Sequence, residues 1–174
     1  MNKIVKLTLI LFLVSALVAG VLGLTNMVTE EPIRLYKEQK TAEAYGAVMD
    51  FDSYEEVKYT GERGEVSKVY KTDNGDWIVE ANVSGSQGMI TVAVGVNADL
   101  SCNGISIISS SETSGLGSKA SNAEFKDQFV GISADQAKVT KDGGVINAIT
   151  GATITSRAVC TAVDAAIAAV STLG

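Results

Sequence analysis

Hydrophobic and polar residues are distributed unevenly along the chain, and the first clear pattern is an apolar run near the N-terminus. Residues 7–28 contain no charged residue and only scattered Ser, Thr and Asn. At about 1.5 Å per residue, a helix of this length spans the roughly 30 Å hydrocarbon core of a bilayer. A cleaved signal peptide is the alternative, although its apolar region is usually only about 7–15 residues long. We therefore predict a retained transmembrane helix.

Charges on the two sides of this run predict its orientation. Two lysines precede it and two glutamates follow it: Lys3, Lys6, Glu30 and Glu31. Because positive charge is enriched on the cytoplasmic side of membrane spans, we expect a cytoplasmic N-terminus in the cell membrane. The rest of the chain would then be extracytoplasmic.

A charged stretch compatible with a helix follows the apolar run. Pro32 suits the first turn of a helix, and residues 33–49 predict a juxtamembrane helix beginning there. An acidic connector is expected around residues 50–56. The predicted organisation is a cytoplasmic N-terminus and transmembrane helix over 1–29, a juxtamembrane helix and connector over 30–60, and a globular domain over 61–174.

The middle of the chain alternates between short β-prone runs and turn residues. The runs cover residues 66–72, 77–83, 89–96 and 105–109. Asn-Gly and Gly-rich turns between alternating runs predict hairpins, so these strands should form an antiparallel meander. Trp77 is expected in the core because an isolated aromatic residue in a strand is usually buried.

The last third combines helical and loop patterns. We expect a short helix over residues 122–129, a strand over residues 145–149 and a closing helix over residues 156–173. The apolar positions of the closing helix follow helical spacing and are mostly small: Ala158, Val159, Ala162, Val163, Ala166, Ile167 and Val170. The predicted fold class is α+β, with a single N-terminal transmembrane helix followed by an extracytoplasmic domain of an antiparallel sheet and packed helices.

Composition excludes several classes of function. The formal net charge of −6 and the lack of a basic stripe argue against nucleic-acid binding. The sequence has no His and only two Cys, which excludes a His-based triad and gives no metal-ligand spacing. We therefore predict neither catalytic residues nor a metal site. Cys102 and Cys160 could pair in an oxidising exterior or remain two buried free thiols.

The stretch "NAITGATITSRAV" (residues 147–159) carries more hydroxyl groups than a helix start requires. Thr150, Thr153, Thr155 and Ser156 surround the small pair Gly151 and Ala152 where the closing helix should begin. Unpaired N–H groups at a helix N-terminus favour a phosphate, and small residues let a ligand approach the backbone. Plain helix capping by Thr and Ser is the alternative.

Two motifs resemble a known family. "TGATITSRAV" (residues 150–159) resembles the [ST]GAT[x][ST]S motif of FMN-binding domains, and "ETSGLGSK" (residues 112–119) is similar to the ETPGLG loop that precedes it. These domains occur in the G subunit of the Rnf ion-translocating electron-transport complex and in the C subunit of the sodium-translocating NADH:quinone reductase. The N-terminal span and the order of the two motifs also agree with this family, and the short chain favours the Rnf protein.

The resemblance implies a cofactor and its ligands. FMN would be attached through a phosphoester bond to Thr153 by a separate flavin transferase, with Thr150, Gly151, Ala152, Thr155 and Ser156 around it. The other loop would lie beside the flavin and supplies Glu112, Thr113, Gly115, Leu116 and Gly117, whose glycines would let backbone approach the ring. Three positions depart from the family pattern: Asn147 replaces an Asp, Ser114 a Pro and Ser110 a His.

Two functions follow as hypotheses. In the first, the chain passes electrons through covalent FMN in a membrane complex that exchanges electrons between ferredoxin and NAD while it moves Na+ or H+. Its partners would be the other membrane and redox subunits, and the chain would not be catalytic alone. In the second, it is a membrane-anchored extracytoplasmic binding or scaffold domain without flavin.

Overall fold

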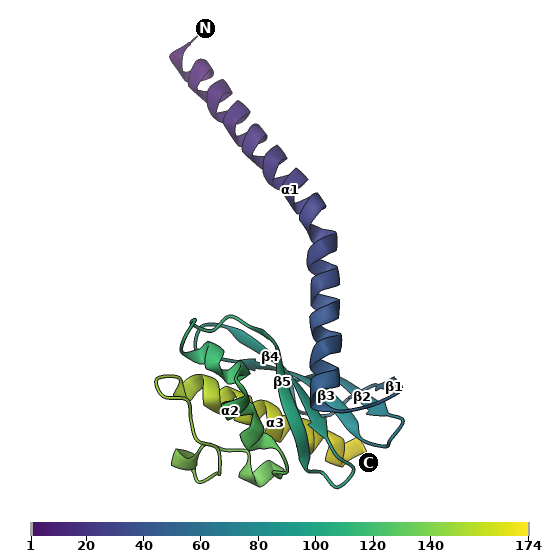
Figure 1. Ribbon diagram of the computed structural model, residues 1–174. Helices are drawn as coiled ribbons and strands as arrows, with labels where there is room; N and C mark the ends of the chain where they lie inside the picture. The colour runs from purple at the N-terminus through teal and green to yellow at the C-terminus, as the bar shows by residue number, and fades with distance from the viewer. Residues whose placement is uncertain (1, 174) are drawn as a thin grey trace. The chain divides into compact units, whose positions relative to one another are not determined.

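An antiparallel five-stranded sheet is the centre of the fold (Figure 1). The computed structural model describes residues 2–173. Each strand pairs with the next along the chain, in the order β1-β2-β3-β4-β5, which confirms the predicted meander. The strands are β1 (Tyr54–Val57), β2 (Val66–Thr72), β3 (Trp77–Ser84), β4 (Met89–Val96) and β5 (Cys102–Ser110).

Helix α3 (Thr153–Leu173) covers one face of this sheet and packs mainly on β3 and β4 (Figure 1). All seven apolar positions that the sequence predicts for its inner face are buried. Because most of them are Ala or Val, the helix backbone can lie close to the strands. Alternate residues of β3 and β4, such as Val79 and Val94, complete this core, and Trp77 is buried in it as predicted.

The opposite face of the sheet holds a smaller cluster. Tyr45 and Val48, at the end of helix α1 (Lys3–Val48), pack there with Ile78 of β3 and Ala93 of β4. The Val48 carbonyl accepts a hydrogen bond of 2.7 Å from Asn103 Nδ2. It lies over Gly95 of β4 and Gly104 of β5, which face one another across the two strands. Because these two glycines have no side chain, the end of α1 can lie close to the sheet.

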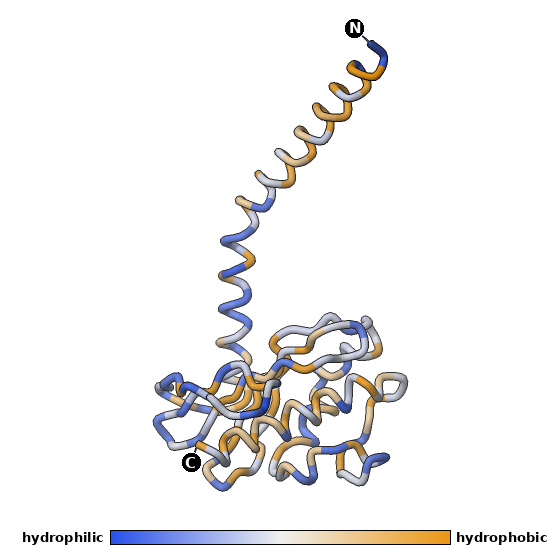
Figure 2. The backbone as a smooth tube through the Cα atoms, turned by 180° about the vertical axis from the view of Figure 1, so that it is seen from behind, coloured by the Kyte–Doolittle hydropathy of each residue, from blue (hydrophilic) through white to orange (hydrophobic). Residues whose placement is uncertain are grey.

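Helix α1 is longer than the sequence predicts. Its first part is apolar and exposed throughout, and a largely hydrophilic part follows (Figure 2). The predicted helix start at Pro32 is wrong, since one helix continues through this residue. Pro32 cannot donate to the carbonyl four residues earlier, but Arg34 forms ion pairs of 2.7 Å with Glu31 and 2.8 Å with Glu38. These pairs support the helix on both sides of Pro32.

Within residues 2–173, two helices, α1 and α3, are long and apolar enough to cross a membrane. Most of α3 is buried against the sheet, so its composition reflects the protein core. The apolar part of α1 has no such cover and is suited to be a membrane anchor. A compact unit begins at Thr41, after this part of the chain.

Two predicted features near the sheet differ in the structure. The expected connector over residues 50–56 contains most of β1, an edge strand that pairs with β2. The strand expected over residues 145–149 is wrong, because only one isolated bridge forms there, between Val139 and Ile146. Its apolar residues resemble a strand, but the Gln128 side chain binds the main chain of Asn147 in place of a neighbouring strand.

Short helical turns occupy the rest of the chain between β5 and α3. The predicted helix over residues 122–129 is present as α2 (Ala123–Lys126) continued by the 3-10 turn η2 (Asp127–Phe129). Three more 3-10 turns are η1 (Gly117–Ser121), η3 (Ala134–Gln136) and η4 (Thr140–Asp142).

Gly95 and Gly104 should differ in how well they accept a side chain. A Cβ at Gly95 would lie 2.6 Å from the Val48 carbonyl oxygen, whereas one at Gly104 would lie at an ordinary 3.7 Å. Gly95→Ala should therefore lower the free energy of unfolding by about 1–3 kcal/mol, because the backbone must shift. The change can be followed in the detergent-solubilised chain by the fluorescence of Trp77, the single tryptophan.

Gly104→Ala is the matched control, in the facing strand and under the same carbonyl. It should leave the free energy of unfolding unchanged or raise it by up to about 1 kcal/mol, because an alanine that fits restricts the unfolded chain. Equal effects of the two substitutions would show that close approach of Val48 does not constrain the sheet.

Candidate functional site

The two sequence motifs line one pocket. Its volume is about 380 Å³, and we call it the motif pocket. The loop after β5 lines it together with the first turn of α3 and the hairpin loop between β3 and β4. Its lining residues are Ser86, Gln87, Glu112, Thr113, Leu116, Gly117, Gly151, Ala152, Thr153, Ile154 and Thr155. Residues of the two motifs that are more than 30 positions apart in the sequence therefore meet at one pocket.

The Glu112 carboxylate connects the three segments of the motif pocket. One oxygen accepts a hydrogen bond of 3.0 Å from the backbone N–H of Gln87 in the hairpin loop. The other accepts a short hydrogen bond from the hydroxyl of Thr155 in α3. The Glu112 backbone N–H in turn binds Ser110 Oγ at the end of β5. Glu112 thus holds the pocket together.

These contacts also determine the charge of Glu112. Partial burial opposes ionisation, but the hydrogen bonds from Gln87, Thr155 and the backbone of Ser86 favour the carboxylate and keep the pKa of Glu112 below its ordinary value. The Glu112 side chain is therefore ionised at neutral pH. Its hydrogen-bond donor Thr155 has a buried side chain.

Two glycines of the motifs have identifiable steric roles. A side chain on buried Gly117 would collide with Glu112 and would lie 2.9 Å from Thr155 Oγ1, so this glycine makes room for the Glu112–Thr155 contact. Gly151 has a φ of +78°, which L side chains rarely adopt, and a Cβ there would lie 3.3 Å from Leu116 Cδ2. Both positions therefore bring the two motifs into contact.

Thr153 is the first residue of α3 and lines the motif pocket. The Ser156 N–H donates to the Ala152 carbonyl at 3.0 Å, so the N–H groups of residues 153–155 precede the first bond within the helix. The neighbouring hydroxyls do not cap these groups, since Thr155 binds Glu112 and Ser156 Oγ donates to the Ala152 carbonyl. The pocket thus combines a hydroxyl with N–H groups suited to a phosphate.

Three of the predicted site residues lie outside the motif pocket. Ser156 is buried, and its Oγ accepts a bond of 2.9 Å from the Ile149 N–H, which fixes the turn before α3. Gly115 forms a turn with a φ of +78°, and its N–H donates to Ser118 Oγ. Thr150 is exposed and lines a different pocket.

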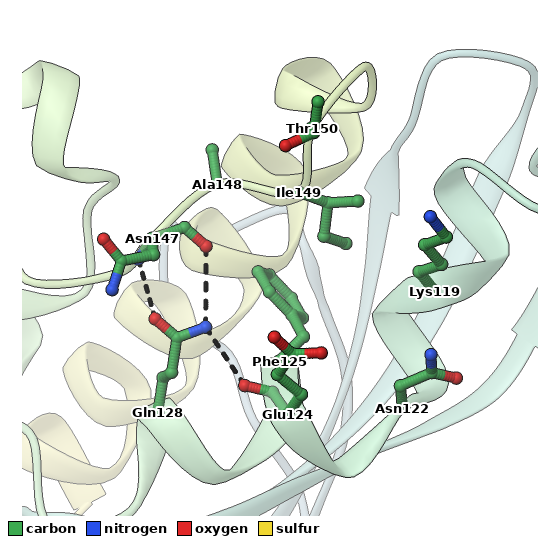
Figure 3. Close-up of a pocket in the computed structure, with 9 residues that line it drawn as sticks. All are labelled: Lys119, Asn122, Glu124, Phe125, Gln128, Asn147, Ala148, Ile149 and Thr150. Carbon is green, nitrogen blue, oxygen red and sulfur yellow. Dashed lines mark hydrogen bonds between the residues drawn. The ribbon is translucent and has the colours of Figure 1, made fainter.

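That second pocket, which we call the side pocket, has a volume of about 240 Å³ (Figure 3). It lies beside the chain that leads into α3 and is lined by Lys119, Asn122, Glu124, Phe125, Gln128, Asn147, Ala148, Ile149 and Thr150. Gln128 Oε1 accepts a bond of 2.7 Å from the Asn147 N–H, and Gln128 Nε2 donates to the Asn147 carbonyl at 3.5 Å. Gln128 therefore holds the chain before the GAT motif, while the exposed Asn147 carboxamide points away from it.

Sequence reasoning missed Ser86 and Gln87. They belong to the turn between two predicted strands and reach the motif pocket only because β4 pairs with β3 and β5. The sole signal in the sequence is the long glycine-containing loop "SGSQG", which by itself indicates a turn.

The two cysteines are free thiols rather than a disulfide. Both are buried, and burial is the main cause that raises the pKa of each to about 12. They are therefore unreactive core residues. Residues 2–173 contain no group of three or more His, Cys, Asp or Glu side chains that could hold a metal ion.

Comparison with known proteins shows the family of the chain. Residues 85–168 match the model of the FMN-binding domain family. The G subunit of an ion-translocating oxidoreductase complex from Methanosarcina acetivorans is 32% identical over 98% of this chain and 96% of its own. The chain belongs to the G-subunit family of these complexes. The resemblance inferred from the two motifs is therefore confirmed.

Two further similarities were found. The G subunit of the Na(+)-translocating ferredoxin:NAD(+) oxidoreductase complex from Acetobacterium woodii is 39% identical over 93% of this chain and 89% of its own. The crystal structure of NqrC from Shewanella oneidensis has a TM-score of 0.48 and 22% identity, covering 63% of this chain and 61% of that one.

The Glu112 contacts predict a specific pH dependence of stability. Because hydrogen bonds hold the folded-state pKa of Glu112 below its unfolded value near 4.3, the ionised form adds stability that is complete above about pH 5. This contribution is lost as the pH falls through the folded-state pKa. Glu112→Gln should therefore lower the midpoint of thermal unfolding at pH 7 and reduce its decline below about pH 5. Thermal unfolding followed by Trp77 fluorescence at pH 7 and below pH 5 would measure both effects.

Glu124→Gln provides a control that removes one exposed carboxylate outside the motif pocket. It should leave the stability at pH 7 within about 0.5 kcal/mol of the original. If Glu112→Gln behaves like this control at pH 7 and keeps the full decline in acid, the Glu112 carboxylate does not hold the pocket together.

Proposed function

We propose that this chain is a redox subunit of a membrane-bound, ion-translocating ferredoxin:NAD oxidoreductase complex and carries FMN esterified to Thr153. The observation that supports this most strongly is the motif pocket, where the two family motifs meet around the Thr153 hydroxyl at the start of α3. The relatives supply the wider context, since their names describe ferredoxin:NAD oxidoreductase and ion translocation.

The residues of the motif pocket fit the parts of FMN. The free N–H groups at the start of α3 suit the phosphate, which the positive end of the helix dipole also favours. Leu116 and Ile154 line the pocket with exposed fractions of 44% and 58%, large values for apolar side chains. They offer apolar contact area for an aromatic ring.

Attachment at Thr153 requires no base in this chain. The Thr153 oxygen would form a bond to the phosphorus, the hydroxyl proton would be released, and the leaving group of an activated FMN donor would depart. The donor and the base belong to a separate flavin transferase, which is consistent with the absence of His from the sequence. Thr153 is half-buried, and Asn147 is exposed beside the same loop for recognition by that enzyme.

The protein and the cofactor then have different tasks. Bound FMN supplies the electron-transfer chemistry, whereas the chain positions it and sets the local charge. Glu112 contributes to this indirectly: both of its oxygens bind protein groups, so it fixes the pocket and places one negative charge near the ring. The remaining subunits of the complex would deliver and accept electrons and move the ion.

Substitution of Thr153 tests the attachment. Thr153→Ala should abolish flavin fluorescence that survives denaturing electrophoresis, after the full chain is expressed with a flavin transferase. The folded state should remain, because the first residue of a helix is at most a cap worth about 1 kcal/mol. Trp77 fluorescence would verify folding.

Thr150→Ala is the matched control, an exposed threonine three residues earlier that lines the side pocket. This variant should keep its covalent flavin. Covalent fluorescence in the Thr153 variant would contradict the attachment, and its absence from the unsubstituted chain would favour the scaffold function without flavin.

We also propose that the apolar part of α1 anchors the chain with its N-terminus in the cytoplasm. The native cysteines are 0% and 4% exposed and should not label. An impermeant maleimide added to intact cells should therefore label the exposed site Glu62→Cys, whereas Lys3→Cys should react only after permeabilisation. The reverse labelling pattern would contradict this orientation.

A further inference from the structure

We infer that Gln87, in the hairpin loop between β3 and β4, binds the pyrimidine edge of the flavin ring through its carboxamide. The inference rests on the proposed function, and it goes further by assigning a ring-binding residue outside both family motifs. It starts from the position of Gln87 in the lining of the motif pocket.

The backbone of Gln87 is fixed in place. Its N–H donates to one oxygen of Glu112, and the other oxygen of the same carboxylate binds Thr155 in the first turn of α3. The hairpin loop and the helical turn that carries Thr153 are therefore bridged by one carboxylate, that of Glu112. Within the loop, the Gly85 N–H donates to the Gly88 carbonyl at 2.8 Å, which closes the hairpin around Gln87.

The side-chain carboxamide of Gln87 is available to bind a ligand. Among residues 2–173, its carboxamide has no hydrogen-bond partner, and the residue is exposed where it lines the pocket. By contrast, the Glu112 carboxylate and the Thr155 hydroxyl bind one another. Gln87 can therefore turn its carboxamide toward a ligand without breaking a contact.

The chemistry of this carboxamide matches the polar edge of the ring. The pyrimidine part of an isoalloxazine presents an N–H donor between two carbonyl acceptors. A carboxamide has one acceptor oxygen and two N–H donors in one plane, so it can accept from the ring N–H and donate to an adjacent carbonyl. Ser86 and Thr113 also line the pocket, but a hydroxyl carries its donor and its acceptors on one oxygen, whereas the carboxamide presents them on two separate atoms in one plane.

The lining of the motif pocket then suits both parts of FMN. Thr153 and the N–H groups at the start of α3 would hold the phosphate, while Leu116 and Ile154 would contact the ring and Gln87 would bind its polar edge. In this arrangement Gln87 is a binding residue that orients the ring and stabilises added electron density on its pyrimidine carbonyls. It would do so independently of Glu112, whose oxygens are already occupied.

Vibrational spectroscopy of the flavin carbonyls tests the contact directly. The full chain, expressed with a flavin transferase and purified in detergent, would be compared with Gln87→Ala and Gln87→Glu by infrared spectroscopy with carbonyl-labelled flavin. Both substitutions remove the carboxamide donor, so at least one ring carbonyl band should shift to higher frequency. Gln87→Glu should also lower the midpoint potential, because a negative charge at this edge disfavours added electrons.

Ser86→Ala is the matched control, since it alters the adjacent pocket residue and leaves the carboxamide in place. It should keep the original carbonyl bands. Both Gln87 variants should retain covalent flavin, because Thr153 is unchanged, and they should melt like the original chain, because the backbone N–H that binds Glu112 remains.

The possible results separate this inference from the proposed function. Carbonyl bands and midpoint potentials that match the original chain in both Gln87 variants would overturn the role of Gln87 and leave the attachment at Thr153 intact. Equal band shifts in Ser86→Ala would also overturn it. Absence of covalent flavin from the original chain would overturn the proposed function, and this inference with it.

Discussion

A single carboxylate, that of Glu112, determines the arrangement of the site. It connects the hairpin loop between β3 and β4, the loop after β5 and the first turn of α3. The sheet makes this possible, because the end of β3, the start of β4 and the end of β5 lie at the same end of an antiparallel meander. The small residues of α3 let this helix lie close to the strands, so that its N-terminus reaches the same place.

Most of the fold could be predicted from local patterns. Strict alternation with turn residues between the runs identified β2 to β5, and helical spacing of small residues identified the inner face of α3. The exceptions depended on partners that are distant in the sequence. Residues 145–149 have a strand-like composition, but their hydrogen bonds go to turns at residues 136–140, to the Gln128 side chain and to Ser156 Oγ in place of a strand. Edge strand β1 was read as a connector because its four residues, "YEEV", are mostly exposed and charged.

The site was predictable to a lesser extent. The two motifs located the pocket, since eight of the eleven predicted ligands line it. The resemblance implied that Glu112 lies beside the flavin, and the structure adds that its carboxylate holds the loops together. Gly117 was expected to let backbone approach the ring, and the structure adds that it makes room for Glu112 and Thr155. Ser86 and Gln87 could not be identified, because only the strand pairing brings their turn to the pocket.

The central claim is that FMN is joined to Thr153, and peptide mass spectrometry tests it most directly. Trypsin cleavage after Lys141 and Arg157 releases one peptide, residues 142–157, which contains all four hydroxyl residues of the motif. This peptide should carry the added mass of FMN, and fragmentation should place that mass on Thr153. An unmodified peptide from chain produced with a flavin transferase, or FMN on Thr150, Thr155 or Ser156, would contradict it.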